Sequence, residues 1–254
     1  MTGIAINNLR LGYGKRTLLE HASATFPAEE LTALIGRNGT GKSTLLKAIA
    51  GLKKTDEGAI LVEGENIATM TPLQIAQKIA FVSTERVHVA HLKVKDVVAL
   101  GRAPYTNWIG RLDAEDEQII ARSLAQVGLT AFADKEMDTL SDGESQRAMI
   151  ARALAQDTPV MLLDEPTAFL DLPNRYEICL LLRRLAHENK KCIFFSSHDL
   201  GIVLEMCDKL ALIDSGKLHH DTPHRLFEQG VLQHLFDGTA LEFADKEGHI
   251  RFHK

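Results

Sequence analysis

Residues 36–44 form a glycine-rich run whose residue types suit the binding of phosphate groups. The run matches the pattern GxxxxGK[ST], follows an apolar segment that predicts a strand, and precedes a predicted helix. Its glycines allow backbone N–H groups to converge on phosphate oxygens, and the helix N-terminus adds favourable partial charge. We expect the Lys42 ammonium to reach the β- and γ-phosphates of a nucleoside triphosphate and the Ser43 hydroxyl to ligate Mg²⁺. The predicted phosphate-binding residues are Gly36, Asn38, Gly39, Gly41, Lys42, Ser43 and Thr44.

Two adjacent carboxylates, Asp164 and Glu165, come directly after the apolar residues Val160–Leu163. Such a pair on its own is more often a solvated strand end, but a phosphate-binding run upstream favours a catalytic role. We expect Asp164 to lie near the Mg²⁺ and Glu165 to polarise the water that attacks the γ-phosphate. Together the two motifs predict a P-loop NTPase.

Alternation of strands and helices around these motifs predicts a mainly parallel sheet. Ser, Thr or Asp before a helix and Gly after it mark the expected helix ends, as at Thr71, Asp113 and Gly128. An Asp214-Ser215-Gly216 turn predicts a hairpin, and a second is expected around Asp245–Gly248. The predicted strands are Ile4–Leu11, Leu31–Ile35, Ala59–Val62, Ile79–Val82, Val160–Leu163 and Cys192–Ser196, and Lys42–Ala50 is a predicted helix.

Composition excludes some functions. The 254 residues carry a formal net charge of −5 without a block of Lys or Arg, which argues against binding to nucleic acid. Three widely spaced cysteines indicate buried thiols in a reducing compartment. No secretory leader or bilayer-spanning apolar run is recognisable. We therefore expect a soluble, cytoplasmic protein that reaches a membrane only through partners.

Residues Leu140–Glu144 read Leu-Ser-Asp-Gly-Glu and resemble the LSGGQ signature of ABC ATPases. Ser141 and Glu144 also form an S-x-x-E capping box, so a helix begins here whatever the family. The resemblance implies that this helix N-terminus, with Ser141 and Gly143, meets the nucleotide bound to a second copy in a head-to-tail homodimer.

Other landmarks occur in the order of that family, over about residues 4–220. Tyr13 resembles the aromatic residue that stacks on adenine. Asp171, in Ala168–Asp171, is similar to the D-loop aspartate. His198, just past a buried strand, resembles the switch histidine that contacts the γ-phosphate. The resemblance thus implies a catalytic role for His198 and nucleotide-site roles for Tyr13 and Asp171.

Two positions depart from the family pattern. The glutamine that usually follows the strand at Phe81–Val82 is replaced by Thr84, with Glu85 next to it. Either side chain could supply an oxygen to Mg²⁺, and Thr84 is the predicted ligand. Asp142 and Glu144 stand where glycine and glutamine are usual in the signature. An aspartate suits a phosphate site only if its side chain points away.

The resemblance implies a RecA-like P-loop core with a mainly parallel sheet, an N-terminal antiparallel β subdomain and an inserted α-helical subdomain. We expect residues 1–86 and 155–235 to form the core, 87–154 the helical subdomain with the signature, and 236–254 a tail. The implied cofactors are ATP and Mg²⁺. The implied partners are a second copy, two integral membrane permease subunits and, indirectly, a substrate-binding protein, at the cytoplasmic face of the plasma membrane.

The segment Val98–Leu112 resembles a stretch found in ATPase subunits of iron-siderophore, haem and cobalamin importers. The alternative is a loop between two helices with Trp108 as a packing anchor. Three other functions share many of the motifs. They are a soluble ABC ATPase of cofactor assembly, an ABC-type translation or DNA-repair ATPase, and a non-catalytic binding subunit. Tandem cassettes or long coiled-coil insertions, which mark the second class, are absent from the sequence.

Overall fold

The computed structural model describes residues 3–14, 16–85, 91–106, 110–239, 241–243 and 250–252. Its main sheet has the strand order β10-β9-β3-β8-β7-β6, in which β3, β6, β7, β8 and β9 run parallel and β10 pairs antiparallel with β9. The bounds are β3 Leu31–Gly36, β6 Ile79–Val82, β7 Val160–Leu163, β8 Cys192–Ser196, β9 Lys209–Asp214 and β10 Lys217–Asp221.

The central strands are apolar because helices cover both faces of the sheet. Every residue of β3, β7 and β8 is buried, as expected for parallel strands between two layers. One core lies between the sheet and α1 (Lys42–Ile49), together with the small N-terminal sheet. A second core joins the opposite face to α5 (Asp142–Ala155), α6 (Leu172–Glu188) and α7 (Leu200–Met206).

The small sheet has the order β2-β1-β4-β5 and is antiparallel throughout. Its strands β1 and β2 carry fully buried apolar side chains, among them Leu9, Leu11, Leu19 and Phe26. Its bounds are β1 Gly3–Tyr13, β2 Arg16–Pro27, β4 Glu57–Val62 and β5 Glu65–Asn66, and the chain then continues through η1 (Ile67–Thr69) and α2 (Pro72–Ala76) to β6.

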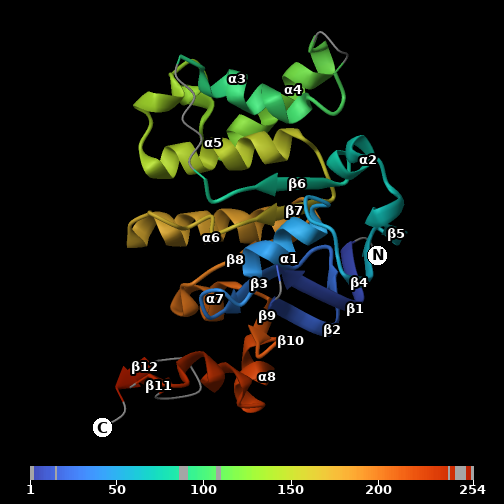
Figure 1. Cartoon of the computed structure of the whole chain (residues 1–254). Coiled ribbons are helices and arrows are strands. Elements are labelled where there is room, and N and C mark those ends of the chain that lie inside the picture. The colour runs from blue at the N-terminus through green and yellow to red at the C-terminus, as the bar shows by residue number, and fades with distance from the viewer. Residues whose placement is uncertain are drawn as a thin grey trace.

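Figure 1 shows α3, α4 and α5 stacked at one end of the molecule, beyond the edge strand β6. Arg102 and Asp116, both buried, form an ion pair of 2.7 Å that ties the end of α3 to α4. Arg102 also donates to the carbonyl of Ala155 at the end of α5, so one side chain joins the three helices. The bounds in this region are α3 Val94–Ala99, η2 Leu100–Arg102, α4 Ala114–Gln126, η3 Thr130–Phe132 and η4 Met137–Thr139.

The C-terminal elements lie at the opposite end of the molecule (Figure 1). Phe243 packs edge-on against Phe227 and Phe236, which joins β11, α8 and η5. His234 holds η5 to the β9–β10 hairpin through Asp214, with Nδ1 2.9 Å from Oδ2. The bounds are α8 Pro223–Glu228, η5 Val231–Phe236, β11 Leu241–Phe243 and β12 Ile250–Phe252.

The predicted fold class and strands are confirmed, as are the helix starts after Thr71, Asp113 and Ser141. The Ser215-Gly216 hairpin and the C-terminal hairpin both form, although the turn at residues 245–248 lies outside the described residues, as does Trp108. Cys179, Cys192 and Cys207 are buried free thiols. Within the described residues no helix is both long and apolar enough to cross a bilayer. The subdomain boundaries stay a prediction.

Candidate nucleotide-binding and hydrolysis site

The glycine-rich run leaves the end of β3 and enters α1 at the same sheet edge as the ends of β7 and β8. Gly36 has a φ of 151°, and a Cβ there would lie 2.8 Å from the carbonyl oxygen of Ile213, so the loop requires glycine at this point. Gly41 precedes α1 with a φ of 107° and gives no side-chain cap. Because glycine has no side chain, Gly41 does not cap the first N–H groups of α1.

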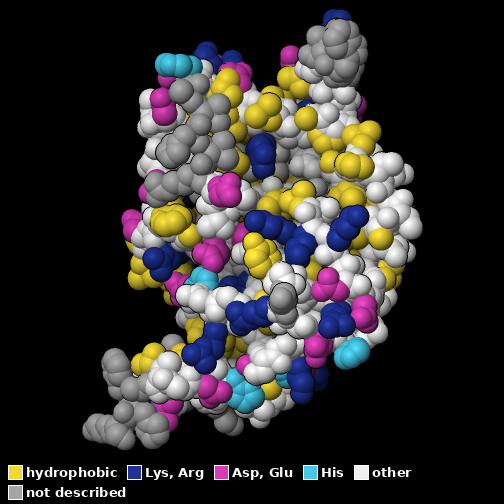
Figure 2. Space-filling model, viewed as in Figure 1, with side chains coloured by type: hydrophobic (Ala, Val, Ile, Leu, Met, Phe, Trp, Pro, Cys, Tyr) yellow, Lys and Arg dark blue, Asp and Glu magenta, His cyan; other side chains and the backbone are white. Residues whose placement is uncertain are grey.

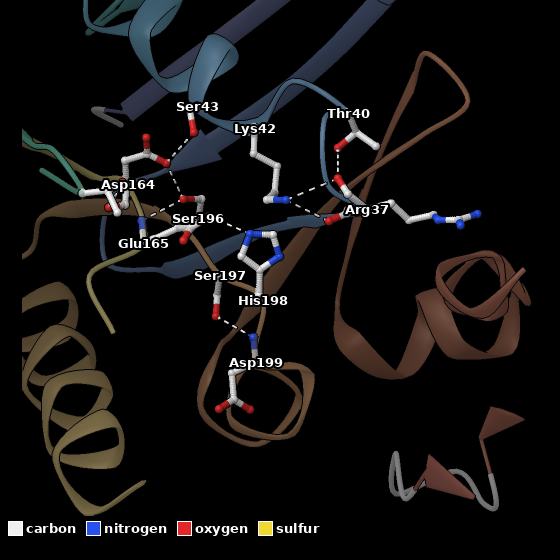
Figure 3. A network of polar contacts seen from close by, with 12 residues as sticks. Arg37, Thr40, Lys42, Ser43, Asp164, Glu165, Ser196, Ser197, His198 and Asp199 are labelled. Carbon is white, nitrogen blue, oxygen red and sulfur yellow. Dashed lines mark hydrogen bonds and ion pairs between the residues drawn. The ribbon is translucent and has the colours of Figure 1, made fainter. Parts of the chain in front are cut away.

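Lys42 folds back over the loop. Its Nζ donates to the carbonyls of Gly36, at 2.9 Å, and Arg37, at 3.4 Å (Figure 3). Burial lowers the pKa of Lys42, and the nearby carboxylates of Glu165 and Asp164 oppose that change. These two hydrogen bonds keep the Lys42 ammonium beside the glycine-rich loop, where an anion such as a phosphate can bind.

Asp164, which directly follows β7, is hydrogen-bonded to Ser43 in the first turn of α1. Ser43 Oγ donates to Asp164 Oδ1 at 3.0 Å, and Ser196 Oγ donates to the same oxygen at 2.7 Å. Thr84 Oγ1 donates to the Asp164 main-chain carbonyl at 2.9 Å. The structure thus brings Ser43, Asp164 and Thr84 together, although the Thr84 hydroxyl proton is directed at the backbone.

Glu165 turns away from Asp164 and faces His198. Its Oε1 lies 2.6 Å from His198 Nε2, and both side chains are partly open to solvent. Glu165 has a φ of 51°, a left-handed conformation that is uncommon for a residue with a Cβ. The structure therefore brings together the predicted pair Glu165 and His198, from the ends of β7 and β8 (Figure 3).

The signature residues begin α5, across a small cavity from Glu165. The cavity, of about 110 Å³, is lined by Thr84, Glu165, Asp142 and the D-loop residues Ala168–Leu170, among others. The Glu144 carboxylate accepts from the main-chain N–H and the hydroxyl of Ser141, at 2.8 Å each, and these bonds hold its pKa below the ordinary value. The predicted capping box is present.

Gly143 and Asp171 both lie next to Asn174. A Cβ on Gly143 would lie 2.7 Å from Asn174 Oδ1, so glycine lets the start of α5 approach α6 closely. Asp171 is the N-cap of α6, and its Oδ1 accepts from the N–H and the Nδ2 of Asn174. The D-loop aspartate and the signature glycine of one chain therefore share a contact residue.

Tyr13 ends β1 and is 71% exposed, with Lys53 Nζ 5.6 Å from its ring centroid. It pairs in register with Arg16, whose Nη1 lies 3.8 Å from the position of a Cβ on Gly39. The antiparallel hairpin thus carries Tyr13 to the side of the glycine-rich loop. An exposed ring in this place is available to stack on a flat ligand.

Two residues of this site were not predicted from the sequence. Ser196 contacts both Asp164 and the N–H of Glu165. Arg175 Nε donates to the Leu170 carbonyl and its Nη1 donates to Asp199 Oδ2, so it links the D-loop to the segment beside His198. Ser196 has a signal in the sequence, since it is a polar residue at the end of an apolar strand and at the same sheet edge as Asp164.

Comparison with known proteins gives consistent matches. The family model described as ABC transporter matches residues 19–168. The chain is 37% identical to the petrobactin import ATP-binding protein FpuC of Bacillus anthracis, over 92% of this chain and 86% of that protein. It is 38% identical to the iron(3+)-hydroxamate import ATP-binding protein FhuC of Bacillus subtilis (strain 168), over 94% and 90%. A solved inward-facing metal-chelate type ABC transporter matches with a TM-score of 0.84 at 26% identity, over 99% of this chain and 97% of that chain.

Proposed function

This chain belongs to the ABC transporter family as an ATP-hydrolysing subunit of an importer, and we propose that its importer takes up an iron–siderophore complex or a related metal chelate. The cargo class rests on the siderophore relatives, which align over nine-tenths of the chain. Haem and cobalamin are the alternative chelates. The observation that carries the ATPase assignment is the meeting of Lys42, Ser43, Asp164, Glu165 and His198 at one sheet edge.

The residues at this edge fit Mg²⁺ together with a nucleoside triphosphate. Ser43 Oγ and Asp164 Oδ1 are hard oxygen donors 3.0 Å apart, which suits the small coordination shell of this ion. Ser43 and Asp164 would hold the metal, with Thr84 as a further predicted ligand. When bound, Mg²⁺ neutralises charge on the phosphate oxygens. Lys42 and the N–H groups of the glycine-rich loop would bind the phosphates, and Tyr13 would stack on the adenine.

Glu165 is the proposed general base. Its carboxylate is oriented by the His198 imidazole at 2.6 Å, and the positive φ at Glu165 separates it from Asp164. The separation gives the adjacent carboxylates different tasks, one toward the metal and one toward the attacking water. His198 would contact the γ-phosphate.

Two copies would form the complete enzyme. Ser141 lies at the exposed N-terminus of α5, across the cavity from the chain's own Glu165, and the buried Gly143 follows in the first turn. A second copy's nucleotide can meet this helix end. Each copy would supply a phosphate loop to one nucleotide and a signature helix to the other.

A second surface is suited to the membrane subunits. A groove of about 640 Å³ lies between α1, α2, β6 and the end of α5, and its lining includes Leu52, Met70, Ile75 and Phe81. Leu52 is 66% exposed. Figure 2 shows hydrophobic side chains on this side of the molecule, near α2 and the helical layer. We propose that a cytoplasmic segment of each permease subunit occupies the groove, which would hold the chain peripherally at the cytoplasmic face.

The groove can be tested by affinity capture from detergent-solubilised native membranes. We expect the tagged chain to recover a polytopic permease, and the Leu52→Arg variant to lose it because a bulky cation would replace an exposed apolar side chain of the groove. Leu180→Arg is the matched control, since Leu180 is 52% exposed on α6, away from the groove. Both variants should bind ATP like the unmodified chain.

Two outcomes would count against these proposals, the first against the importer and the second against the groove. One is recovery of soluble proteins alone by the unmodified chain, which would favour a cofactor-assembly ATPase. The other is equal capture by both leucine variants, which would remove the groove as the docking site. With the permease reconstituted in vesicles, ATP-driven uptake of a labelled ferric siderophore, but not of haem or cobalamin, would support the cargo class.

A further inference from the structure

Ser196 is a fully buried serine that bonds two adjacent residues of the site. It is the last residue of β8 and is 0% exposed. Its Oγ accepts from the Glu165 N–H at 2.9 Å and donates to Asp164 Oδ1 at 2.7 Å (Figure 3). One hydroxyl therefore holds the main chain of one carboxylate residue and the side chain of the other.

The main chain between Asp164 and Glu165 needs such support. Glu165 has a φ of 51°, and a left-handed conformation in a non-glycine residue persists only when its surroundings fix it. The Asp164 N–H donates to the Val82 carbonyl at 2.8 Å, which continues the sheet to this point. The chain leaves the sheet at the next residue, where the Glu165 N–H has Ser196 Oγ as its acceptor.

Three other side chains of the site each fix only one of the residues Asp164 and Glu165. Ser43 and Thr84 bond the side chain and the carbonyl of Asp164, and His198 contacts the Glu165 carboxylate. Among the residues that the structure describes, the Ser196 side chain is the one found to bond both. A change in its position would alter the angle between the two carboxylates.

The direction of these bonds follows from the single hydroxyl proton of serine. Because the proton goes to the Asp164 carboxylate, the Ser196 lone pairs remain for the Glu165 N–H. An alanine here would leave a main-chain donor and a carboxylate oxygen without this partner in a buried place.

We propose that Ser196 is a positioning residue for ATP hydrolysis, which sets Glu165 relative to Asp164 through one shared hydroxyl. The proposal rests on the proposed function, in which Glu165 is the general base and Asp164 a metal ligand. Because Ser196 is fully buried, we expect it to act through these two residues and not on the nucleotide or the attacking water.

The test uses the full chain with Ser196→Ala and, as a matched control, Ser123→Ala. Ser123 is also buried, and its hydroxyl bonds the Ile119 carbonyl within α4, away from the site. Amide hydrogen exchange at Glu165 is followed by NMR in the nucleotide-free protein. Steady-state ATPase kinetics and ATP affinity are then measured for each variant.

In the unmodified protein the Glu165 amide should be protected from exchange. In Ser196→Ala its exchange should accelerate at least about 10-fold, and kcat should fall about 10- to 100-fold, the usual loss for a residue supporting a metal or catalytic ligand. The KM for ATP should change by less than about twofold, because the phosphate-loop contacts are kept. The Ser123→Ala variant should match the unmodified protein in all three.

Rapid exchange of Glu165 in the unmodified protein would overturn the proposal without reference to any variant. Faster exchange in Ser196→Ala with an unchanged kcat would also overturn it, and so would a rise in KM alone. These outcomes are separate from a failure of the proposed function. That failure would appear as full turnover in Glu165→Gln, whatever the state of the Ser196 bonds.

Discussion

At the scale of the residue, Glu165 gives the most direct chemical prediction. Its Oε1 lies 2.6 Å from His198 Nε2, and an amide in its place keeps the shape but accepts no proton. We expect Glu165→Gln to lower kcat about 10²- to 10⁴-fold, the usual contribution of a general base, while ATP binding is retained. Phosphate release at saturating Mg²⁺ and ATP measures the effect. Glu115→Gln, an exposed change on α4, should be silent, and turnover in Glu165→Gln close to that of the control would refute the assignment.

The sequence predicts a residue of this site when its type and spacing are tied to chemistry. Lys42 and Ser43 follow from the glycine pattern, and Asp164 and Glu165 from two carboxylates after an apolar strand. Ser196 and Arg175 were missed because serine and arginine are common, and because Glu165 lies 31 positions from Ser196 and Asp199 lies 24 positions from Arg175. Such contacts depend on which strand ends become neighbours, which a local pattern does not specify.

At the scale of the element, the contact between β10 and β2 predicts a pH dependence of stability. The His220 ring packs edge-on against Phe26 at 4.7 Å. Burial lowers the pKa of His220 to about 4, Lys209 acts in the same direction, and Asp221 opposes it. The imidazole of the unfolded chain takes its proton near 6.5, so the unfolded state binds more protons between pH 6.5 and 4. The free energy of unfolding should therefore fall as pH decreases through this range.

The contribution of His220 to this pH dependence can be isolated by calorimetry at pH 7 and pH 5 on the unmodified chain and on His220→Leu. The two proteins have all their other titrating groups in common. We expect the variant to lose less Tm between the two pH values, because leucine fills the apolar contact and takes no proton. Equal losses of Tm in the two proteins would show that His220 does not contribute.

Elements were predicted well where their pattern is regular. The buried strands β3, β7 and β8 were recognised because both faces are covered and their sequences are mostly apolar. Strand β2 was not predicted. Its register with β1 shifts between Leu9 and Leu11 and again between Leu11 and Gly12, and His21 has a positive φ, so the alternation of polar and apolar residues is broken.

At the scale of the whole molecule, the signature helix and the phosphate loop belong to one chain, and we propose that they act on different nucleotides. The Ser141 end of α5 is exposed, and the apolar D-loop side chain Phe169 is 67% exposed beside it. An exposed large apolar residue next to an open helix N-terminus is expected at a surface that a partner covers. The homodimer and the subdomain limits of 87–154 remain predictions from the sequence, because a single chain reveals neither.

The dimer can be trapped if hydrolysis is what releases it. With ATP and Mg²⁺, Glu165→Gln should elute at twice the 28.0 kDa mass of the chain in light-scattering chromatography, and at the monomer mass without nucleotide. Adding Ser141→Arg should abolish the trapped dimer, since a bulky cation would stand where the second copy's nucleotide must approach. Ser141→Ala in the same background is the control for the arginine variant. It also loses the cap, at a cost of about 1 kcal/mol in helix stability, but it adds no bulk at the contact. If the arginine variant still dimerises, the two copies do not meet through the signature helix, and the head-to-tail arrangement is wrong.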